Sequence, residues 1–245
     1  MGQQQREDVL YYTSMHYLRC SYSYNKPLLM ILGPMFILLL TSQLVAAQGG
    51  VPLEELPPQT LTPVQLRALF LPEYLQDFAD TNVPLPVTPN STVPTAGFAQ
   101  SCLEALELEP GANVYIIGRA TGFVSAYFAR NGMEVTVSEE ETSLIDRYRG
   151  IWEELGLTEI IEIGFSELKN SFGTRRFDAI LIHAGVTDIP EVLTNMLAER
   201  GVIIAPLYNL QDTQIMVQLR KDGSSWSVST LENQFFPFSP LILTD

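Results

Sequence analysis

The run Val114-Tyr-Ile-Ile-Gly118-Arg-Ala-Thr-Gly122-Phe123 decides the fold. Its first four residues, 114–117, form a short continuous apolar segment, which is typical of a strand buried on both faces of a sheet. Glycines at 118 and 122 then predict a tight turn, and a helix begins at 124–130. Such glycines let the backbone approach a nucleotide closely, because no Cβ stands in the way. Taken alone, the two glycines are explained equally well by a purely structural turn.

The alternation of strand and helix continues on both sides of this run. Further apolar strand segments are predicted at 134–137, 160–163, 177–182 and 201–205, and helices at 98–108, 143–155 and 189–197. Strands that alternate with helices in this way form βαβ units around a parallel sheet. Two more strands, 214–220 and 226–231, are separated by the hairpin turn Lys221-Asp-Gly-Ser-Ser. The predicted fold class is α/β, with a mostly parallel sheet and antiparallel C-terminal strands.

Changes in composition divide the chain into three parts. Residues 96–245 carry the strand and helix alternation, and residues 49–95 read as an extended Pro-rich cap segment with one short helix from Thr62-Pro63. Residues 1–48 are an N-terminal lead that contains an apolar run at 28–44, shorter than a typical membrane-spanning helix. Its basic flank and small-residue exit predict a signal peptide, and hence an exported (periplasmic or secreted) chain. The alternatives are an uncleaved membrane anchor formed by 28–44 and a buried core helix.

Charge and the scarcity of metal-binding side chains exclude several classes of function. The net charge of −14 argues against nucleic acid as a partner, since phosphate binding needs clustered Lys and Arg. Beyond residue 47 the sequence holds one cysteine, Cys102, and one histidine, His183. No metal site or Cys–His dyad is therefore predicted. We expect Cys102 in the core, and His183 is either a general base or ligand, or a hydrogen-bonded half-buried residue.

Glu139 is the candidate ligand for a cofactor ribose. In open parallel sheets the ligand lies at the carboxyl ends of the strands, near the point where the strand order reverses. Glu139 follows the second strand, about 20 residues past the glycine turn, where an acidic side chain can accept hydrogen bonds from both ribose hydroxyls. A carboxylate at the start of a solvated helix is the competing interpretation.

Several segments in the same order resemble the protein-L-isoaspartate O-methyltransferase family. The resemblance covers about residues 60–241, and the segments that carry it are Arg67-Ala-Leu-Phe-Leu-Pro72-Glu, Val83-Pro-Leu-Pro-Val87, Leu106-Glu-Leu-Glu-Pro-Gly111-Ala-Asn-Val, Phe177-Asp-Ala-Ile-Leu-Ile182, Asp188-Ile-Pro-Glu191, Gly201-Val-Ile-Ile-Ala-Pro206 and Phe235-Phe-Pro-Phe-Ser-Pro-Leu241. It implies a Rossmann-like S-adenosylmethionine-dependent methyltransferase fold. It also implies methylation of the side-chain carboxylate of isoaspartyl residues in damaged proteins, which would be the partners.

The resemblance assigns roles to particular residues of this chain. Thr92 is the residue retained from the loop that holds the substrate. Gly118, Thr121 and Gly122 are expected to bind the cofactor along the glycine turn. Glu139 is expected to bind it at the end of the second strand, and Phe165 and Ser166 beside the adenine. No metal is implied.

At other positions the sequence departs from the family pattern. Ile116 stands where the family has an acid before the glycine turn, and Ala120 replaces the middle glycine, with Arg119 beside it. Pro94 replaces the active-site serine and offers neither a hydroxyl nor a backbone N–H. A second interpretation is therefore open: an exported or membrane-tethered, catalytically inactive relative that binds a protein partner or an altered ligand.

Overall fold

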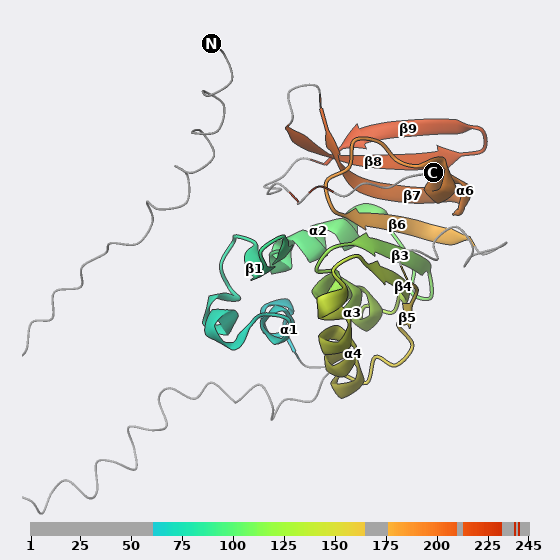
Figure 1. Cartoon of the computed structure of the whole chain (residues 1–245). Helices are drawn as coiled ribbons and strands as arrows, with labels where there is room; N and C mark the ends of the chain where they lie inside the picture. Colours follow the sequence, from blue (N-terminus) through green and yellow to red (C-terminus); the bar gives the residue numbers. More distant parts are fainter. Residues whose placement is uncertain (1–60, 165–175, 210–212, 232–237, 239, 241–245) are drawn as a thin grey trace, which may run out of the picture. The chain divides into compact units, whose positions relative to one another are not determined.

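The computed structural model describes residues 61–164, 176–209, 213–231, 238 and 240 (Figure 1). The chain divides into two compact units, Met1–Gly50 and Val51–Asp245, and every described residue belongs to the second. Within the described part, no helix is long and apolar enough to cross a membrane. The N-terminal lead, with its predicted signal or anchor at 28–44, lies outside the described residues and stays a prediction.

A seven-stranded sheet forms the centre of the described fold, as the alternation of strands and helices predicts. Its order is β5-β4-β3-β6-β7-β8-β9. The first five strands in this order are parallel and the last two are antiparallel, which confirms the predicted sheet. The strands are β3 (Asn113–Gly118), β4 (Glu134–Glu139), β5 (Ile161–Glu162), β6 (Phe177–His183), β7 (Leu197–Tyr208), β8 (Gln214–Asp222) and β9 (Ser225–Thr230). The chain runs outward from β3 to β5 and returns to the other side of β3, so the strand order reverses between β3 and β6.

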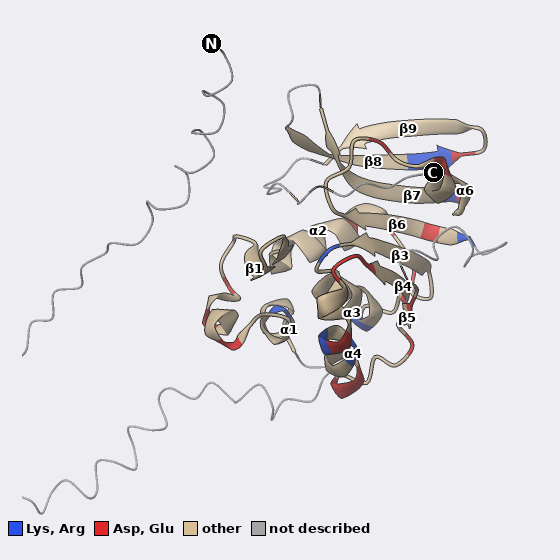
Figure 2. Cartoon of the chain, in the orientation of Figure 1, with Lys and Arg blue, Asp and Glu red and all other residues tan. Residues whose placement is uncertain are grey.

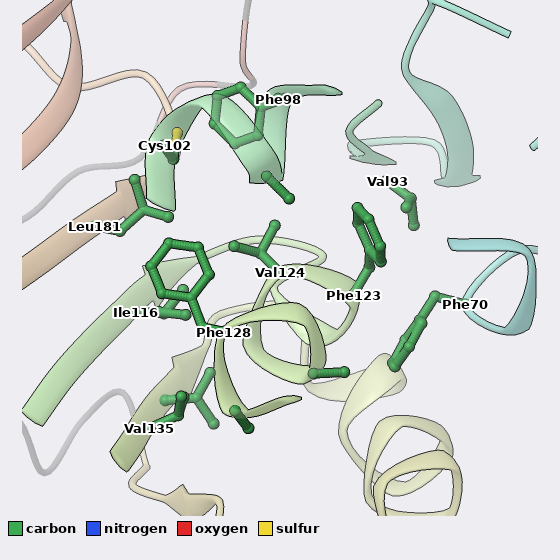
Figure 3. Close-up of a cluster of buried hydrophobic side chains, with 14 of the residues drawn as sticks. Phe70, Val93, Phe98, Cys102, Ile116, Phe123, Val124, Phe128, Val135 and Leu181 are labelled. Atoms are coloured by element: carbon green, nitrogen blue, oxygen red, sulfur yellow. The ribbon is translucent and has the colours of Figure 1, made fainter. Parts of the chain in front are cut away.

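Both faces of the sheet are covered, and β3 shows how. Ile116 belongs to the apolar cluster on the side of α2 (Ala96–Leu106) and α3 (Gly122–Arg130), where it lies near Val124 and Leu181 (Figure 3). Tyr115 and Ile117 belong to the opposite cluster, which includes side chains of α6 (Glu191–Asn195). All three β3 residues are fully buried. Alternating side chains of one strand thus enter two cores, which explains the uninterrupted apolar run.

Some helix and strand boundaries differ from those predicted. The helix predicted at 189–197 is only the short α6, because Leu197 already pairs with Phe177 in the sheet. The helix predicted at 98–108 is α2, which begins at Ala96 behind the N-cap Thr95 and ends before Glu107, whose φ is 53°. The helix predicted at 143–155 consists of a 3-10 turn, η5 (Thr142–Leu144), followed by α4 (Ile145–Glu154).

The described part of the cap segment holds more structure than one helix. Helix α1 (Pro63–Leu69) begins where Thr62-Pro63 predicts, and Thr62 forms a capping box with Gln65. A 3-10 helix, η4 (Glu73–Phe78), follows it. The antiparallel hairpin of β1 (Leu85–Thr88) and β2 (Ser91–Val93) comes next, and it contains most of the loop that the resemblance assigns to substrate binding.

Arg67 holds this cap segment together. Its side chain is fully buried and donates to the carbonyl oxygens of Ala79 and Thr81, each at 2.8 Å, and of Val83 at 2.5 Å. A longer bond of 3.5 Å reaches the carbonyl of Val93 in β2. Burial lowers the pKa of Arg67 to about 10, and the group stays charged at neutral pH. One guanidinium therefore links α1 to the segment after η4 and to the β1–β2 hairpin.

Candidate functional site

The carboxyl ends of three neighbouring strands meet at the point where the strand order reverses. Gly118 at the end of β3 pairs with Glu139 at the end of β4 and with His183 at the end of β6. These residues therefore lie level with one another, at the edge of the sheet where ligands of open α/β folds bind. Figure 2 shows acidic positions at the end of β4 and along the following α4. The sequence-predicted Gly118, Thr121, Gly122 and Glu139 come together here.

The carboxylate of Glu139 accepts four hydrogen bonds from the chain itself. Oε1 accepts from the backbone N–H of Ala120 at 3.0 Å and from that of Glu141 at 2.9 Å. Oε2 accepts from the backbone N–H of Thr121 at 2.7 Å and from the Thr121 hydroxyl at 2.8 Å. A carboxylate offers about four lone-pair sites, so all of them are used. Glu139 is 3% exposed, and it is neither on a solvated helix face nor free of partners.

Atoms of the chain occupy the space beside both glycines of the turn. Gly118 has a φ of +149°, and a Cβ there would collide with the backbone carbonyl of His183. A Cβ on Gly122 would come within 2.5 Å of the Tyr148 ring. Both positions therefore require glycine for packing, whatever else the turn binds. Ala120, where the family has glycine, takes a φ of +51°, which is uncommon for a residue with a Cβ.

His183 is a buried, neutral, hydrogen-bonded residue. Its Nδ1 lies 2.5 Å from the backbone oxygen of Arg119, so this nitrogen carries the proton and donates it. The ring packs edge-on against Phe98 and Phe238. Burial lowers its pKa to about 4, although the bond to Arg119 raises it. Of the two roles expected for His183, the structure shows the hydrogen-bonded one, with deeper burial than predicted.

Arg119, which follows the first glycine, forms an ion pair with Glu140. The two side chains are joined through Nε and Oε2, and Nη2 donates to Oε1 at 2.9 Å. They are 21% and 30% exposed. The positive charge that the sequence places beside the turn is therefore balanced by its neighbour on β4.

The β1–β2 hairpin reaches the same edge of the sheet. The hydroxyl of Thr88 donates to Glu141 Oε2 at 3.4 Å, which connects the hairpin to the segment after β4. Thr92 on β2 is exposed, whereas Ser91 beside it is 2% exposed and its hydroxyl has no hydrogen-bond partner among the described residues. Sequence reasoning missed Ser91, and only its position next to Thr92 could have indicated it.

The other residues that the sequence analysis singled out either lie in the core or fall outside the described residues. Ile116 packs in the core shown in Figure 3, and burial raises the pKa of the Cys102 thiol, also in this core. In the described part, no three His, Cys, Asp or Glu side chains gather in a way that could hold a metal ion. Phe165 and Ser166 lie outside the described residues, and their predicted place beside the adenine stays a prediction.

Comparisons with known proteins agree with this geometry. Residues 58–241 match the family model of protein-L-isoaspartate(D-aspartate) O-methyltransferase (PCMT). Protein-L-isoaspartate O-methyltransferase 1 of Rhodopseudomonas palustris (strain HaA2) is 30% identical over 161 residues, which cover 63% of each chain. The corresponding protein of Herpetosiphon aurantiacus is 28% identical over 177 residues, covering 72% of this chain and 77% of that one. This chain thus spans less than two thirds of the first relative's length.

Two solved structures share the fold. A protein-L-isoaspartate O-methyltransferase has a TM-score of 0.63 at 20% identity, covering 73% of this chain and 61% of that one. A putative protein-L-isoaspartate O-methyltransferase from Plasmodium falciparum, in complex with S-adenosyl-L-homocysteine, has a TM-score of 0.55 at 18% identity, covering 72% and 88%.

The sheet order, with an acidic residue beside a glycine turn at the strand reversal, defines a Rossmann-like fold of the S-adenosylmethionine-dependent methyltransferase class. Within that class, the match over residues 58–241 shows that the chain belongs to the protein-L-isoaspartate O-methyltransferase family.

The two buried titratable groups of the site give opposite pH dependences of stability. Burial raises the pKa of Glu139 from 4.5 to about 7, despite its four hydrogen bonds. The folded chain thus retains a proton that the unfolded chain releases, and this stability is lost as pH rises from about 4.5 to 7. His183, with a pKa lowered from 6.5 to about 4, contributes stability that is lost as pH falls through that range. Each effect is on the order of 3 kcal/mol.

We therefore expect the Glu139→Gln and His183→Gln variants to change the pH profile in opposite directions. Urea unfolding at pH 4, 5.5 and 7.5 gives the free energies. Relative to Glu139→Gln, the free energy of unfolding of the wild type should fall as the pH rises to 7.5. Relative to His183→Gln, it should fall as the pH is lowered to 4. Parallel profiles for the wild type and both variants would contradict this account of the site.

Proposed function

We propose that this chain uses S-adenosylmethionine to methylate the side-chain carboxylate of isoaspartyl residues in damaged proteins. The observation that carries the proposal is the Glu139 carboxylate, which lies at the end of β4 beside the glycine turn. Family membership over residues 58–241 supports the choice of reaction and of substrate.

The described residues offer an acceptor for the ribose of this cofactor, which donors of the chain itself occupy in the free protein. A ribose diol needs an acceptor, and Glu139 is a carboxylate level with the end of β3 and held by the turn itself. The Arg119–Glu140 ion pair balances the positive charge that follows Gly118 and would otherwise repel a sulfonium. When bound, S-adenosylmethionine supplies a methyl group activated by its positively charged sulfur. The proposal keeps Phe165 and Ser166 beside the adenine, and it keeps the predicted export or anchoring through residues 28–44.

The chain's own task in this reaction is alignment. A carboxylate is already ionised and nucleophilic at neutral pH, so the reaction needs little acid–base assistance and the protein supplies mainly orientation. His183 agrees with this, because its ring is buried and packs against Phe98 and Phe238. The exposed hydroxyl of Thr92 can donate to a substrate carboxylate, whereas the Ser91 hydroxyl beside it is buried. Arg67 and Thr88 hold the hairpin that presents Thr92.

The first test combines binding with methylation. The full chain is titrated calorimetrically with S-adenosylmethionine and S-adenosylhomocysteine, and methyl transfer is then measured with matched isoaspartyl and aspartyl peptides. We expect binding, and methylation of the isoaspartyl peptide alone. Thr92→Val should lower kcat/KM roughly tenfold through one lost hydrogen bond, with cofactor affinity unchanged.

Thr158→Val, another exposed threonine, serves as the matched control and should keep wild-type kinetics. A folded chain that binds neither cofactor form would contradict the proposed function and leave the non-enzymatic interpretation. Binding without any methylation of the isoaspartyl peptide would contradict the substrate assignment alone.

A second prediction concerns the charge of Arg119. Glu140→Gln leaves the positive charge of Arg119 unbalanced. This should weaken the binding of S-adenosylmethionine, whose sulfur is cationic, and not that of S-adenosylhomocysteine, whose sulfur is uncharged. The ratio of the two affinities should shift about threefold against S-adenosylmethionine, since a partly exposed charge acts weakly, and the shift should shrink at high salt. Glu162→Gln removes one of the two carboxylate partners of Arg149, elsewhere in the fold, and should leave the ratio unchanged. An unchanged ratio in Glu140→Gln would show that the ion pair does not shield the cofactor.

A further inference from the structure

The hydroxyl of Thr121 occupies the position that a ribose hydroxyl would need. It donates to Oε2 of Glu139 at 2.8 Å and completes the set of four hydrogen bonds that fills the carboxylate. The side chain is fully buried, so water does not compete for this contact. A ribose diol can bond to Glu139 only where one of the four donors gives way.

Three of the four donors are fixed by the backbone. The N–H groups of Ala120 and Thr121 belong to the turn, which is held at its far end because Ser125 N–H donates to the Thr121 carbonyl at 2.9 Å. The Glu141 N–H follows a residue whose own N–H donates to Gly118 O at 2.7 Å. Moving any of these would disturb the sheet edge or the start of α3. The Thr121 hydroxyl needs only a rotation about χ1 to leave.

The backbone conformation of Thr121 leaves its hydroxyl to Glu139. Thr121 is the N-cap residue of α3, but its φ of −75° and ψ of −13° are helical, whereas a capping threonine ordinarily has an extended backbone. Within the described residues, its side chain makes no cap bond with the first turn of the helix. The bond to Glu139 is therefore the contact that holds the hydroxyl in its present rotamer.

Resting on the function proposed above, we propose that Thr121 is an internal competitor for the cofactor ribose and sets its affinity. In the free chain its hydroxyl mimics a ribose hydroxyl on Glu139. When the cofactor binds, the ribose takes over this contact and the Thr121 hydroxyl turns away from Glu139. The residue thus determines how strongly a ligand with ribose hydroxyls is bound, without itself touching the transferred methyl group.

The test is the affinity of Thr121 variants for S-adenosylhomocysteine, measured by calorimetry on the full chain. Thr121→Ala removes both the hydroxyl and its volume, and it should bind about tenfold more tightly, which corresponds to about 1.4 kcal/mol. Thr121→Val has no hydroxyl but keeps a methyl group of similar size, and it should bind more tightly than the wild type and less tightly than Thr121→Ala. Thr121→Ser keeps the hydroxyl and should stay near the wild type. Ser125→Ala removes a buried hydroxyl one helical turn away that has no hydrogen-bond partner in the described part, and should leave affinity unchanged.

An analogue of S-adenosylhomocysteine without the 2′ and 3′ hydroxyls identifies the contact. It should bind the wild type and Thr121→Val equally, because it does not compete for Glu139. Wild-type binding of S-adenosylhomocysteine combined with equal or weaker binding by Thr121→Val and Thr121→Ala would overturn the inference and leave the proposed function intact. A lack of binding by every folded variant would overturn the proposed function and the inference with it.

Discussion

The Glu139 carboxylate is the group on which the arrangement of the candidate site depends. It is buried at the end of β4 and joins the glycine turn after β3 to the segment that leads into α4. A buried carboxylate is tolerated only with hydrogen-bond donors, and the turn supplies three of them, two from its backbone and one from the Thr121 hydroxyl. The hydrogen bonds to Glu139 therefore fix the conformation of the turn, and the same bonds stabilise the carboxylate in its buried position.

This mutual dependence explains how the site accommodates its unusual residues. His183 and Tyr148 leave no room for a Cβ at Gly118 and Gly122, so the turn is closely packed even without a ligand. Ile116, in the place of a family acid, extends the core under the turn. The charge of Arg119 is balanced by Glu140. Two of the departures from the family pattern, Ile116 and Arg119, thus have partners within the fold.

The features that could be predicted from the sequence are those set by hydrophobic periodicity and by short spacings between residues. The strand at 114–117, its glycine turn and the acid at 139 lie where hydrophobic periodicity and spacing indicated. The helix predicted at 189–197 was too long, because strand pairing with Phe177 overrides helical periodicity at Leu197. The contact between Thr121 and Glu139 was not predictable, since it depends on how a turn meets the neighbouring strand 18 residues later. Nor does any pattern show that the Ser91 hydroxyl is buried without a partner.

The most direct test of the account is a crystal structure of the chain with S-adenosylhomocysteine, in which the distances from the Glu139 carboxylate oxygens to the ribose oxygens are measured. The account predicts hydrogen bonds of about 2.6 to 3.0 Å between them, with the Thr121 hydroxyl turned away from the carboxylate. A bound ligand whose ribose lies away from Glu139, with Thr121 still donating to the carboxylate, would contradict it.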